Sequence, residues 1–219
     1  MSEQNQTPQL DWREGGIPVS TRFDDPYFSL AGGLEETRHV FLAGNDLPAR
    51  LHPGFHIAEL GFGTGLNLLA LAQIAEMPIR FTSFEAFPMD AAQLSRAHAA
   101  FPDELDLLSA ELRRGITQPR FTVGQVTAEI VIGDARKTLP NWEGMADAWF
   151  LDGFSPAKNP ELWNEALLDQ VGRHTAPEGS FATYSAAGYI RRALTASGFE
   201  VSRAPGYAGK RHMSRGVMR

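Results

Sequence analysis

From residue 55 onward, short apolar runs alternate with longer stretches in which apolar residues recur at helical spacing. The short runs predict β structure, and they cover residues 55–60, 80–85, 121–132, 146–152 and 179–184. The helical spacing predicts helices, which cover residues 66–75, 90–100, 103–113, 159–174 and 186–197. Two further segments, 199–204 and 211–218, predict a terminal β-hairpin. This alternation is typical of an α/β fold with a mostly parallel sheet that helices cover on both faces.

Residues 1–54 do not follow this alternation. Segments 22–28 and 32–38 mix aromatic, acidic and glycine residues without a clear helical or strand period. We therefore expect residues 1–54 to form an ordered extension that packs on a core domain of residues 55–219. A chain of 219 residues is long enough for one large domain with such an extension.

The composition excludes several kinds of protein. The chain has no cysteine, which excludes disulfides, thiolate metal sites and cysteine nucleophiles. Its six histidines show no metal-ligand spacing, so no metal is expected. No apolar run approaches the roughly 18 residues that a membrane span needs, and the N-terminus has no basic or hydrophobic signal region. We therefore expect a cytoplasmic protein without a membrane contact.

The charge is unevenly distributed. The net charge of −6 argues against broad non-specific binding of nucleic acid. Residues 188–219, however, contain seven Lys/Arg and one acidic residue, a local charge of +6, so the remainder carries −12. The basic end is either a face that contacts phosphates or ordinary solvated surface.

A glycine-rich loop joins the first predicted strand of the core to its helix. Glycines at positions 61, 63 and 65 let the backbone pass close to a ligand. The following helix offers free N–H groups and a positive dipole end, which suit a phosphate or a carboxylate. A dinucleotide fingerprint would place its third glycine three residues after the second. The actual spacing, with Glu59 before it and Asn67 after it, favours S-adenosylmethionine over a dinucleotide.

Two acidic residues at later strand ends support a nucleoside-containing cofactor. Glu85 ends the second strand of the core, where its carboxylate can accept both ribose hydroxyls. Asp134 follows the β-rich segment, where it can accept from the adenine amino group. Each acid alone is as well explained as a surface or capping residue, but together with the glycine loop they indicate one binding site.

Residues 152–160, with the sequence DGFSPAKNP, follow the apolar run 146–151. In open α/β sheets, ligands bind at the carboxyl ends of the strands. A carboxylate, a glycine, an aromatic residue and two prolines at such an end suggest a loop that holds a planar or amine-bearing group. The alternative is a turn in which Asp152 only caps local amides.

With these residues in place, the chain resembles the class I S-adenosylmethionine-dependent methyltransferases. More narrowly, it resembles the methyltransferase domain of the bifunctional proteins of tRNA 5-methylaminomethyl-2-thiouridine biosynthesis. The likeness covers nearly the whole chain, and its most specific part is the segment 152–160. Its other segments are 23–29, 33–37, 40–42, 59–67 and 206–213.

The resemblance implies a Rossmann-like fold with a mostly parallel seven-stranded sheet and an antiparallel C-terminal strand. It implies methyl transfer from S-adenosyl-L-methionine to the amine of 5-aminomethyl-(2-thio)uridine at the wobble position of tRNA. Bifunctional members carry a second, flavin-dependent oxidoreductase domain that generates this amine. The chain ends at Arg219 without such a domain. We therefore expect a stand-alone methyltransferase or an excised domain of a bifunctional enzyme, with a separate flavin-dependent oxidoreductase activity as a partner.

The resemblance also assigns roles to residues. Asp152 would orient the amine and help to remove its proton, and Phe154 would stack on the uracil or face the sulfonium. Three basic residues are candidates for tRNA phosphate contact: Lys158, Lys210 and Arg211. The cofactor-binding candidates are Glu59, Gly61, Phe62, Gly63, Thr64, Gly65, Asn67, Glu85, Asp134 and Asp152.

Three other functions compete with this interpretation. A methyltransferase or aminopropyltransferase for a small free amine would need the same fold and acids but no basic face. An NAD-dependent oxidoreductase is disfavoured by the glycine spacing and by the lack of a Tyr-Lys or His-Asp arrangement. A non-catalytic RNA-binding module would have a degenerate pocket, whereas the glycine loop and the strand-end acids are all intact.

Overall fold

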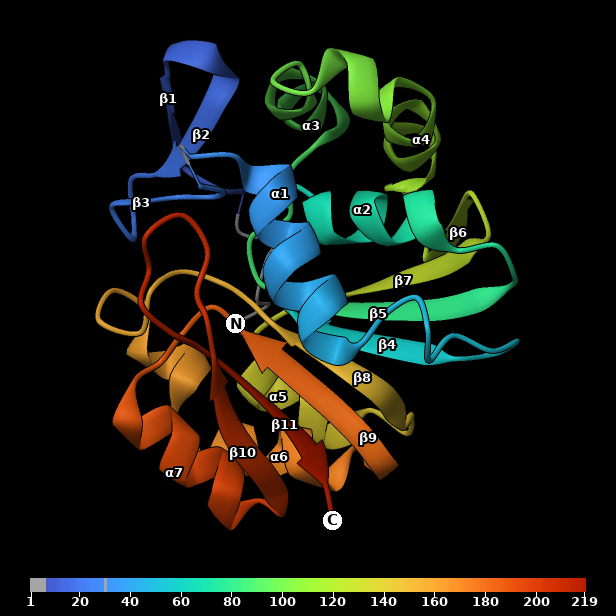
Figure 1. Ribbon diagram of the computed structural model, residues 1–219. Helices are drawn as coiled ribbons and strands as arrows, with labels where there is room; N and C mark the ends of the chain where they lie inside the picture. Colours follow the sequence, from blue (N-terminus) through green and yellow to red (C-terminus); the bar gives the residue numbers. More distant parts are fainter. Residues whose placement is uncertain (1–6, 30) are drawn as a thin grey trace.

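The computed structural model describes residues 7–29 and 31–219, leaving the side chains of residues 102–104 aside (Figure 1). Residues 1–6 and 30 of the predicted extension lie outside the described residues. Within these limits the centre of the molecule is an eight-stranded sheet in the order β10-β11-β9-β8-β4-β5-β7-β6. Its strands are β4 (His56–Leu60), β5 (Ile79–Glu85), β6 (Arg120–Val123), β7 (Val126–Ile132), β8 (Ala146–Leu151), β9 (Thr175–Thr183), β10 (Phe199–Ala204) and β11 (Met213–Met218).

The sheet confirms the predicted fold class. Strands β9, β8, β4, β5 and β7 are mutually parallel, and β11 runs antiparallel between β9 and β10. The described sheet has one strand more than the seven expected, because β6 pairs antiparallel with β7 at the edge. Gly124, with φ of +56°, lets the chain reverse there. The β-rich segment predicted at 121–132 is therefore a hairpin.

Helices cover both faces of the sheet, as predicted (Figure 1). The helices are α1 (Gly33–Thr37), α2 (Leu66–Ile74), α3 (Ala91–His98), α4 (Pro102–Gly115), α5 (Ala135–Thr138), α6 (Glu165–Arg173) and α7 (Gly188–Ala196). The strand period shows how the two cores form. In β8, Ala148 and Phe150 pack with α1, α2 and α4, whereas Trp149 and Leu151 pack with α6 and α7. Within the described residues no helix is long and apolar enough to cross a membrane.

The segment predicted as one helix over 159–174 is divided. A 3₁₀ turn, η5 (Pro160–Trp163), comes first, and α6 begins only after Asn164. Asn164 has extended backbone angles, and its Oδ1 accepts a hydrogen bond from Leu167 N at 2.9 Å. An N-cap residue has non-helical backbone angles, so Asn164 separates η5 from α6 and the two do not form one helix. The prediction of a continuous helix there is wrong.

The region before residue 55 has its own structure. Strands β1 (Leu10–Arg13), β2 (Ile17–Ser20) and β3 (Asp25–Pro26) form a small antiparallel sheet, with the 3₁₀ turn η1 (Glu14–Gly16) between β1 and β2. Helix α1 continues into the π-helical turn η2 (Arg38–Leu42) and the 3₁₀ turn η3 (Ala43–Asn45). Leu34, Phe41 and Leu42 are buried in the same core cluster as α2. These side chains fix α1 beside the carboxyl ends of the strands.

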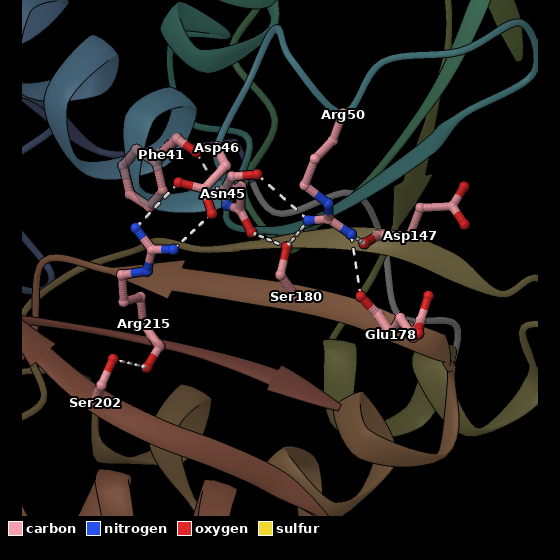
Figure 2. Close-up of polar contacts among 9 residues, drawn as sticks. All are labelled: Phe41, Asn45, Asp46, Arg50, Asp147, Glu178, Ser180, Ser202 and Arg215. Atoms are coloured by element: carbon pink, nitrogen blue, oxygen red, sulfur yellow. Dashed lines mark hydrogen bonds and ion pairs between the residues drawn. The ribbon is translucent and has the colours of Figure 1, made fainter. Parts of the chain in front are cut away.

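Arg50 ties this region to the central sheet (Figure 2). Its Nη2 donates to the carbonyl oxygen of Asp147 at 3.2 Å and to that of Glu178 at 3.1 Å. Its Nη1 donates to the carbonyl oxygen of Asn45 at 3.3 Å and to Ser180 Oγ. One guanidinium thus satisfies carbonyl groups from three separate segments, which holds η3 against β8 and β9.

Candidate cofactor and substrate pocket

A cavity of about 1310 Å³ lies at the carboxyl ends of β4, β5, β7 and β8. The chain builds the sheet outward in one direction through β5 and in the other through β8, so its strand order reverses beside β4. Ligands of open α/β folds bind at this kind of switch point. Most of the predicted site residues line the cavity: Gly61, Phe62, Gly63, Thr64, Asn67, Glu85, Asp134, Asp152, Phe154, Lys158 and Lys210. The predicted residues Glu59, Gly65 and Arg211 are outside its lining.

The glycine loop after β4 packs directly on the loop after β8. Gly61 has φ of +82°, and a Cβ on it would come 3.1 Å from Gly153 Cα. A side chain at Gly61 would separate the two loops, and one at Gly153 would collide with Leu162. Gly63, with φ of +54°, faces the Tyr27 ring, which a Cβ would meet at 3.1 Å. Glycine is therefore required here for close approach as well as for its backbone angles.

Asn67, in the first turn of α2, connects two carboxyl groups. Its Nδ2 donates to Glu59 Oε1 at 2.8 Å and to Asp152 Oδ2 at 2.9 Å. Its Oδ1 accepts from Thr37 Oγ1 at 2.9 Å, which fixes the orientation of the amide. The second oxygen of Glu59 accepts from Ser83 Oγ at 2.6 Å. Glu59 therefore acts behind the cavity wall, where it holds Asn67.

Burial changes the protonation of these carboxyl groups. It raises the pKa of Glu59 well above its ordinary value, so this carboxyl resists ionisation. Burial also raises the pKa of Asp152 to about 7, while hydrogen bonds from Gly153 N and Asn67 oppose the rise. Asp152 thus exists in both protonation states near neutral pH. Its Oδ1 accepts from Gly153 N at 2.8 Å, so it caps a local amide and also lines the cavity.

The two other strand-end acids have different surroundings. Glu85 is buried and accepts from Gly63 N at 2.9 Å and from Phe87 N at 2.6 Å. Burial raises its pKa. Asp134 caps α5 by accepting from Arg136 N at 3.0 Å, and it also pairs with the Arg136 side chain at 2.5 Å. This arginine lowers the pKa of Asp134, which is therefore ionised.

Phe154 forms part of an aromatic group at the cavity. Its ring stacks on Phe23 with a centroid distance of 4.7 Å and an interplanar angle of 25°. Tyr27 contacts it edge-on at 4.9 Å. Trp163 Nε1 donates to the Phe154 carbonyl oxygen at 2.9 Å and fixes the backbone beneath the ring. Phe23 precedes β3 and Tyr27 directly follows it. The region before residue 55 therefore supplies one wall of the pocket.

Acidic residues from the region before residue 55 hold the loop after β8 and the loop between β10 and β11. Asp25 Oδ2 accepts from Ser155 N at 2.8 Å, and Asp25 Oδ1 lies 3.6 Å from Lys158 Nζ. Glu36 Oε1 pairs with Lys210 Nζ at 2.6 Å. The ammonium of Lys210 also lies 5.1 Å from the Tyr184 ring centroid. Both lysines are thus neutralised at the cavity.

Sequence reasoning did not assign roles to Asp25, Glu36 or Thr37. All three lie in the segments 22–28 and 32–38, which stood out only as acidic and aromatic residues without a structural period. This lack of a period was the only sign in the sequence that these segments have a role other than forming a regular helix or strand. Their partners lie more than one hundred residues away, apart from Asn67, so spacing along the chain does not reveal the contacts.

Comparison with known proteins defines the class of protein. The family described as S-adenosyl-L-methionine-dependent methyltransferase matches residues 96–219, more than half of the chain. The protein therefore belongs to the S-adenosyl-L-methionine-dependent methyltransferases, and the sheet order and strand-end cavity agree with that membership.

Within this class the chain is similar to a particular protein. It is 46% identical to the tRNA 5-methylaminomethyl-2-thiouridine biosynthesis bifunctional protein MnmC of Chromobacterium violaceum, over 95% of this chain and 34% of that protein. The MnmC of Stutzerimonas stutzeri is 42% identical over 96% of this chain and 34% of its own length. The chain thus spans about a third of these relatives. The crystal structure of MnmC2 from Aquifex aeolicus has the same fold, with a TM-score of 0.78, 24% identity, and coverage of 97% of this chain and 71% of that one.

Proposed function

We propose that this protein transfers the methyl group of S-adenosyl-L-methionine to the primary amine of 5-aminomethyl-(2-thio)uridine at the wobble position of tRNA. The observation that carries the proposal is Asp152, which directly follows β8, lines the cavity and has a pKa of about 7. An alkylamine is mostly protonated at neutral pH and then lacks the lone pair needed for attack, so a proton acceptor of this pKa suits it. The names of the relatives support this amine as the target.

The glycines and carboxylates at the cavity fit S-adenosyl-L-methionine. Gly61 and Gly63 leave space that a Cβ would fill, so main chain can lie against a ligand there. The carboxylate of Glu85 suits the ribose hydroxyls. The carboxylate of Asp134, which already accepts hydrogen bonds from Arg136, suits the adenine amino group as a further donor. The remaining candidates act from the same loop and its first helical turn: Phe62, Thr64, Gly65 and Asn67, with Glu59 behind them.

The reaction asks the protein mainly to position two groups in line and to provide an unprotonated amine. When bound, S-adenosyl-L-methionine supplies an electrophilic methyl group on a cationic sulfur. Asn67 and the Gly153 amide hold the two oxygens of Asp152, which accepts a hydrogen bond from the substrate amine and takes its proton. The Tyr184 hydroxyl donates to the Gly153 carbonyl oxygen at 2.8 Å and fixes that turn. Phe154 provides a ring for stacking on the uracil.

The size of the cavity supports a second ligand beside the cofactor. Pockets for one drug-sized ligand measure about 300–1,000 Å³, and this cavity measures about 1310 Å³. The volume beyond that needed for one ligand suits a flipped-out nucleoside better than a very small amine. A tRNA substrate also favours the cytoplasm as the place of action. By the same proposal, a flavin-dependent oxidoreductase activity supplies the amine, in agreement with the bifunctional character of the relatives.

Transfer of labelled methyl from S-adenosyl-L-methionine to bulk tRNA from cells lacking this protein tests the proposal. We expect the label in a 5-methylaminomethyl-type uridine after nucleoside analysis. Asp152→Ala should lose transfer and keep cofactor binding, whereas Asp106→Ala, which changes an exposed carboxylate on α4, should keep both. Full turnover by Asp152→Ala would contradict the assigned role. Label in a free nucleoside or polyamine, with none in tRNA, would favour the small-amine methyltransferase or aminopropyltransferase.

A further inference from the structure

The basic C-terminal part of the chain divides into two groups of residues. Three of its seven basic side chains have acidic partners: Lys210 pairs with Glu36, Arg215 with Asp46 and Arg219 with Glu200. Within the described part of the chain, the other four form no ion pair: Arg191, Arg192, Arg203 and Arg211. The uncompensated charge of this region therefore rests on four arginines.

The fold places these arginines at the cavity edge of the sheet. Strand β9 ends there, and only four residues separate it from helix α7, which carries Arg191 and Arg192. Strand β10 runs parallel to β9, because both are antiparallel to β11, so Arg203 near the carboxyl end of β10 lies at the same edge. Arg211 belongs to the loop that joins β10 to β11. Helix α7 packs beside β10 (Figure 1).

The side of β10 that carries Arg203 is also defined. Phe199 and Val201, at alternating positions, pack into the core cluster that contains α7. Arg203 continues that alternation and is exposed, so it lies on the α7 side of the strand. The two α7 arginines and Arg203 therefore share one side of the molecule.

Arg191 and Arg192 converge instead of spreading apart. A Cβ on Gly188 would lie 3.3 Å from Arg192 Nη1 and 4.0 Å from Arg191 Nη2. Arg191 Nε is buried and has no hydrogen-bond partner. Two like charges near one point repel, and a buried donor without an acceptor is unfavourable. An anionic oxygen beside Gly188 would lie close to both guanidinium groups and would offset their repulsion.

We propose that these four arginines, which we call the arginine face (Arg191, Arg192, Arg203 and Arg211), bind the phosphate backbone of tRNA. The inference rests on the proposed function, and it locates the surface that holds the RNA while its wobble base enters the cavity. Charges on a helix, a strand and a loop match a polyanion that extends across all three. The acidic remainder of the chain repels the same polyanion and so directs it to this face.

The arginine face revises the residues expected to contact phosphates. Lys158 and Lys210 are held by Asp25 and Glu36 at the cavity, so they position loops of the protein. Of the three basic residues predicted from the sequence, Arg211 alone belongs to the arginine face. Tyr189, 39% exposed in the first turn of α7, offers a ring beside it on which an unpaired base can stack.

The test measures KM and kcat for tRNA, and their dependence on salt, in the double variant Arg191→Gln/Arg192→Gln and in Arg203→Gln. The matched control is Arg173→Gln, an exposed arginine at the end of α6, at the opposite edge of the sheet. We expect the double variant to raise KM about 5-fold to 25-fold, with kcat and S-adenosyl-L-methionine affinity unchanged. The slope of log affinity against log salt should fall in magnitude by about 1 to 2. Arg191→Lys/Arg192→Lys should keep that slope.

The outcomes separate the two proposals. If the unaltered protein transfers methyl to tRNA but the double variant and Arg203→Gln match Arg173→Gln in KM and salt slope, the arginine face is wrong and the proposed function stands. If the unaltered protein transfers no methyl to tRNA, both are wrong. A fall in kcat with unchanged KM would also overturn the inference, because it would place these residues in the chemical step.

Discussion

The pH dependence of methyl transfer tests the hydrogen bonds around Asp152. Asn67 Nδ2 donates to Asp152 Oδ2 at 2.9 Å, and this bond favours the ionised carboxylate. The variant Asn67→Ala removes the donor and leaves Asp152 between the loops after β4 and β8. Burial then acts with less opposition, so the pKa of Asp152 should rise above 7.

The size of the effect follows from the bond that is lost. A hydrogen bond to a charged group contributes about 1.5–3 kcal/mol, and one pKa unit corresponds to about 1.36 kcal/mol. The pKa of Asp152 should therefore move from about 7 to about 8–9. The ionised form accepts the proton, so the unaltered protein should react about tenfold faster at pH 8 than at pH 6. In Asn67→Ala the half-maximal rate should lie about one to two pH units higher.

The assay is a single-turnover measurement with saturating cofactor and tRNA from about pH 6 to about pH 9. Saturation removes effects of the variant on cofactor affinity. Ser83→Ala is the matched control, because Ser83 Oγ donates to Glu59 at 2.6 Å and makes no bond to Asp152. Its pH profile should have the midpoint of the unaltered protein.

An unchanged or lowered midpoint in Asn67→Ala would refute the reasoning. Ionisation of the substrate amine also makes the rate depend on pH, but that ionisation belongs to the tRNA and is independent of Asn67. A midpoint common to all three proteins would therefore mean that Asp152 does not accept the proton.

Three further predictions concern stability. Folding raises the pKa of Asp152 from 3.8 to about 7, so the protein loses stability as pH rises through this range and the carboxyl ionises. Asp152→Asn cannot ionise and should be more stable than the unaltered protein at pH 8, by up to about 4 kcal/mol. Near pH 4 the two proteins should be equally stable in urea titrations. Gly153 has φ of +119°, which alanine does not tolerate, so Gly153→Ala should lower stability by about 1–3 kcal/mol and reduce methyl transfer; unaltered stability and transfer would contradict this. Arg50→Ala should cost about 3 kcal/mol because the carbonyl groups of Asn45, Asp147 and Glu178 lose their common donor. Arg215→Ala breaks only an ion pair with Asp46 (Figure 2) and should cost at most about 1 kcal/mol; equal losses in thermal unfolding would refute the distinction.

The regular part of the fold was predictable because its signals are local. The apolar run 55–60 and the helical spacing at 66–75 agree with β4 and α2 to within one residue at each end. The predicted terminal hairpin pairs as β10 and β11. Prediction was wrong where one polar side chain overrides periodicity: Asn164 caps α6 and divides the segment 159–174.

The candidate site was predictable where its residues directly follow parallel strands. Glu85, Asp134 and Asp152 line one cavity because parallel strands bring their carboxyl ends together. The ion pairs that the site residues form could not be predicted from the sequence in the same way. Arg136 engages Asp134 from two residues away, and Glu36 holds Lys210 from the other end of the chain. Such contacts depend on the packing of α1 and of the β10–β11 loop.

The contacts that close the pocket also determine when it can form. Asp25 binds Ser155 across 130 positions, and Glu36 binds Lys210 across 174. Contacts of such high sequence separation require the closure of long loops, which costs entropy before the contact contributes. A growing chain on the ribosome therefore holds its glycine loop long before it holds a finished pocket. The Glu36 contact forms only when Lys210, in the loop between β10 and β11, reaches α1, so a chain in synthesis lacks this part of the pocket wall until residues beyond 210 have been added.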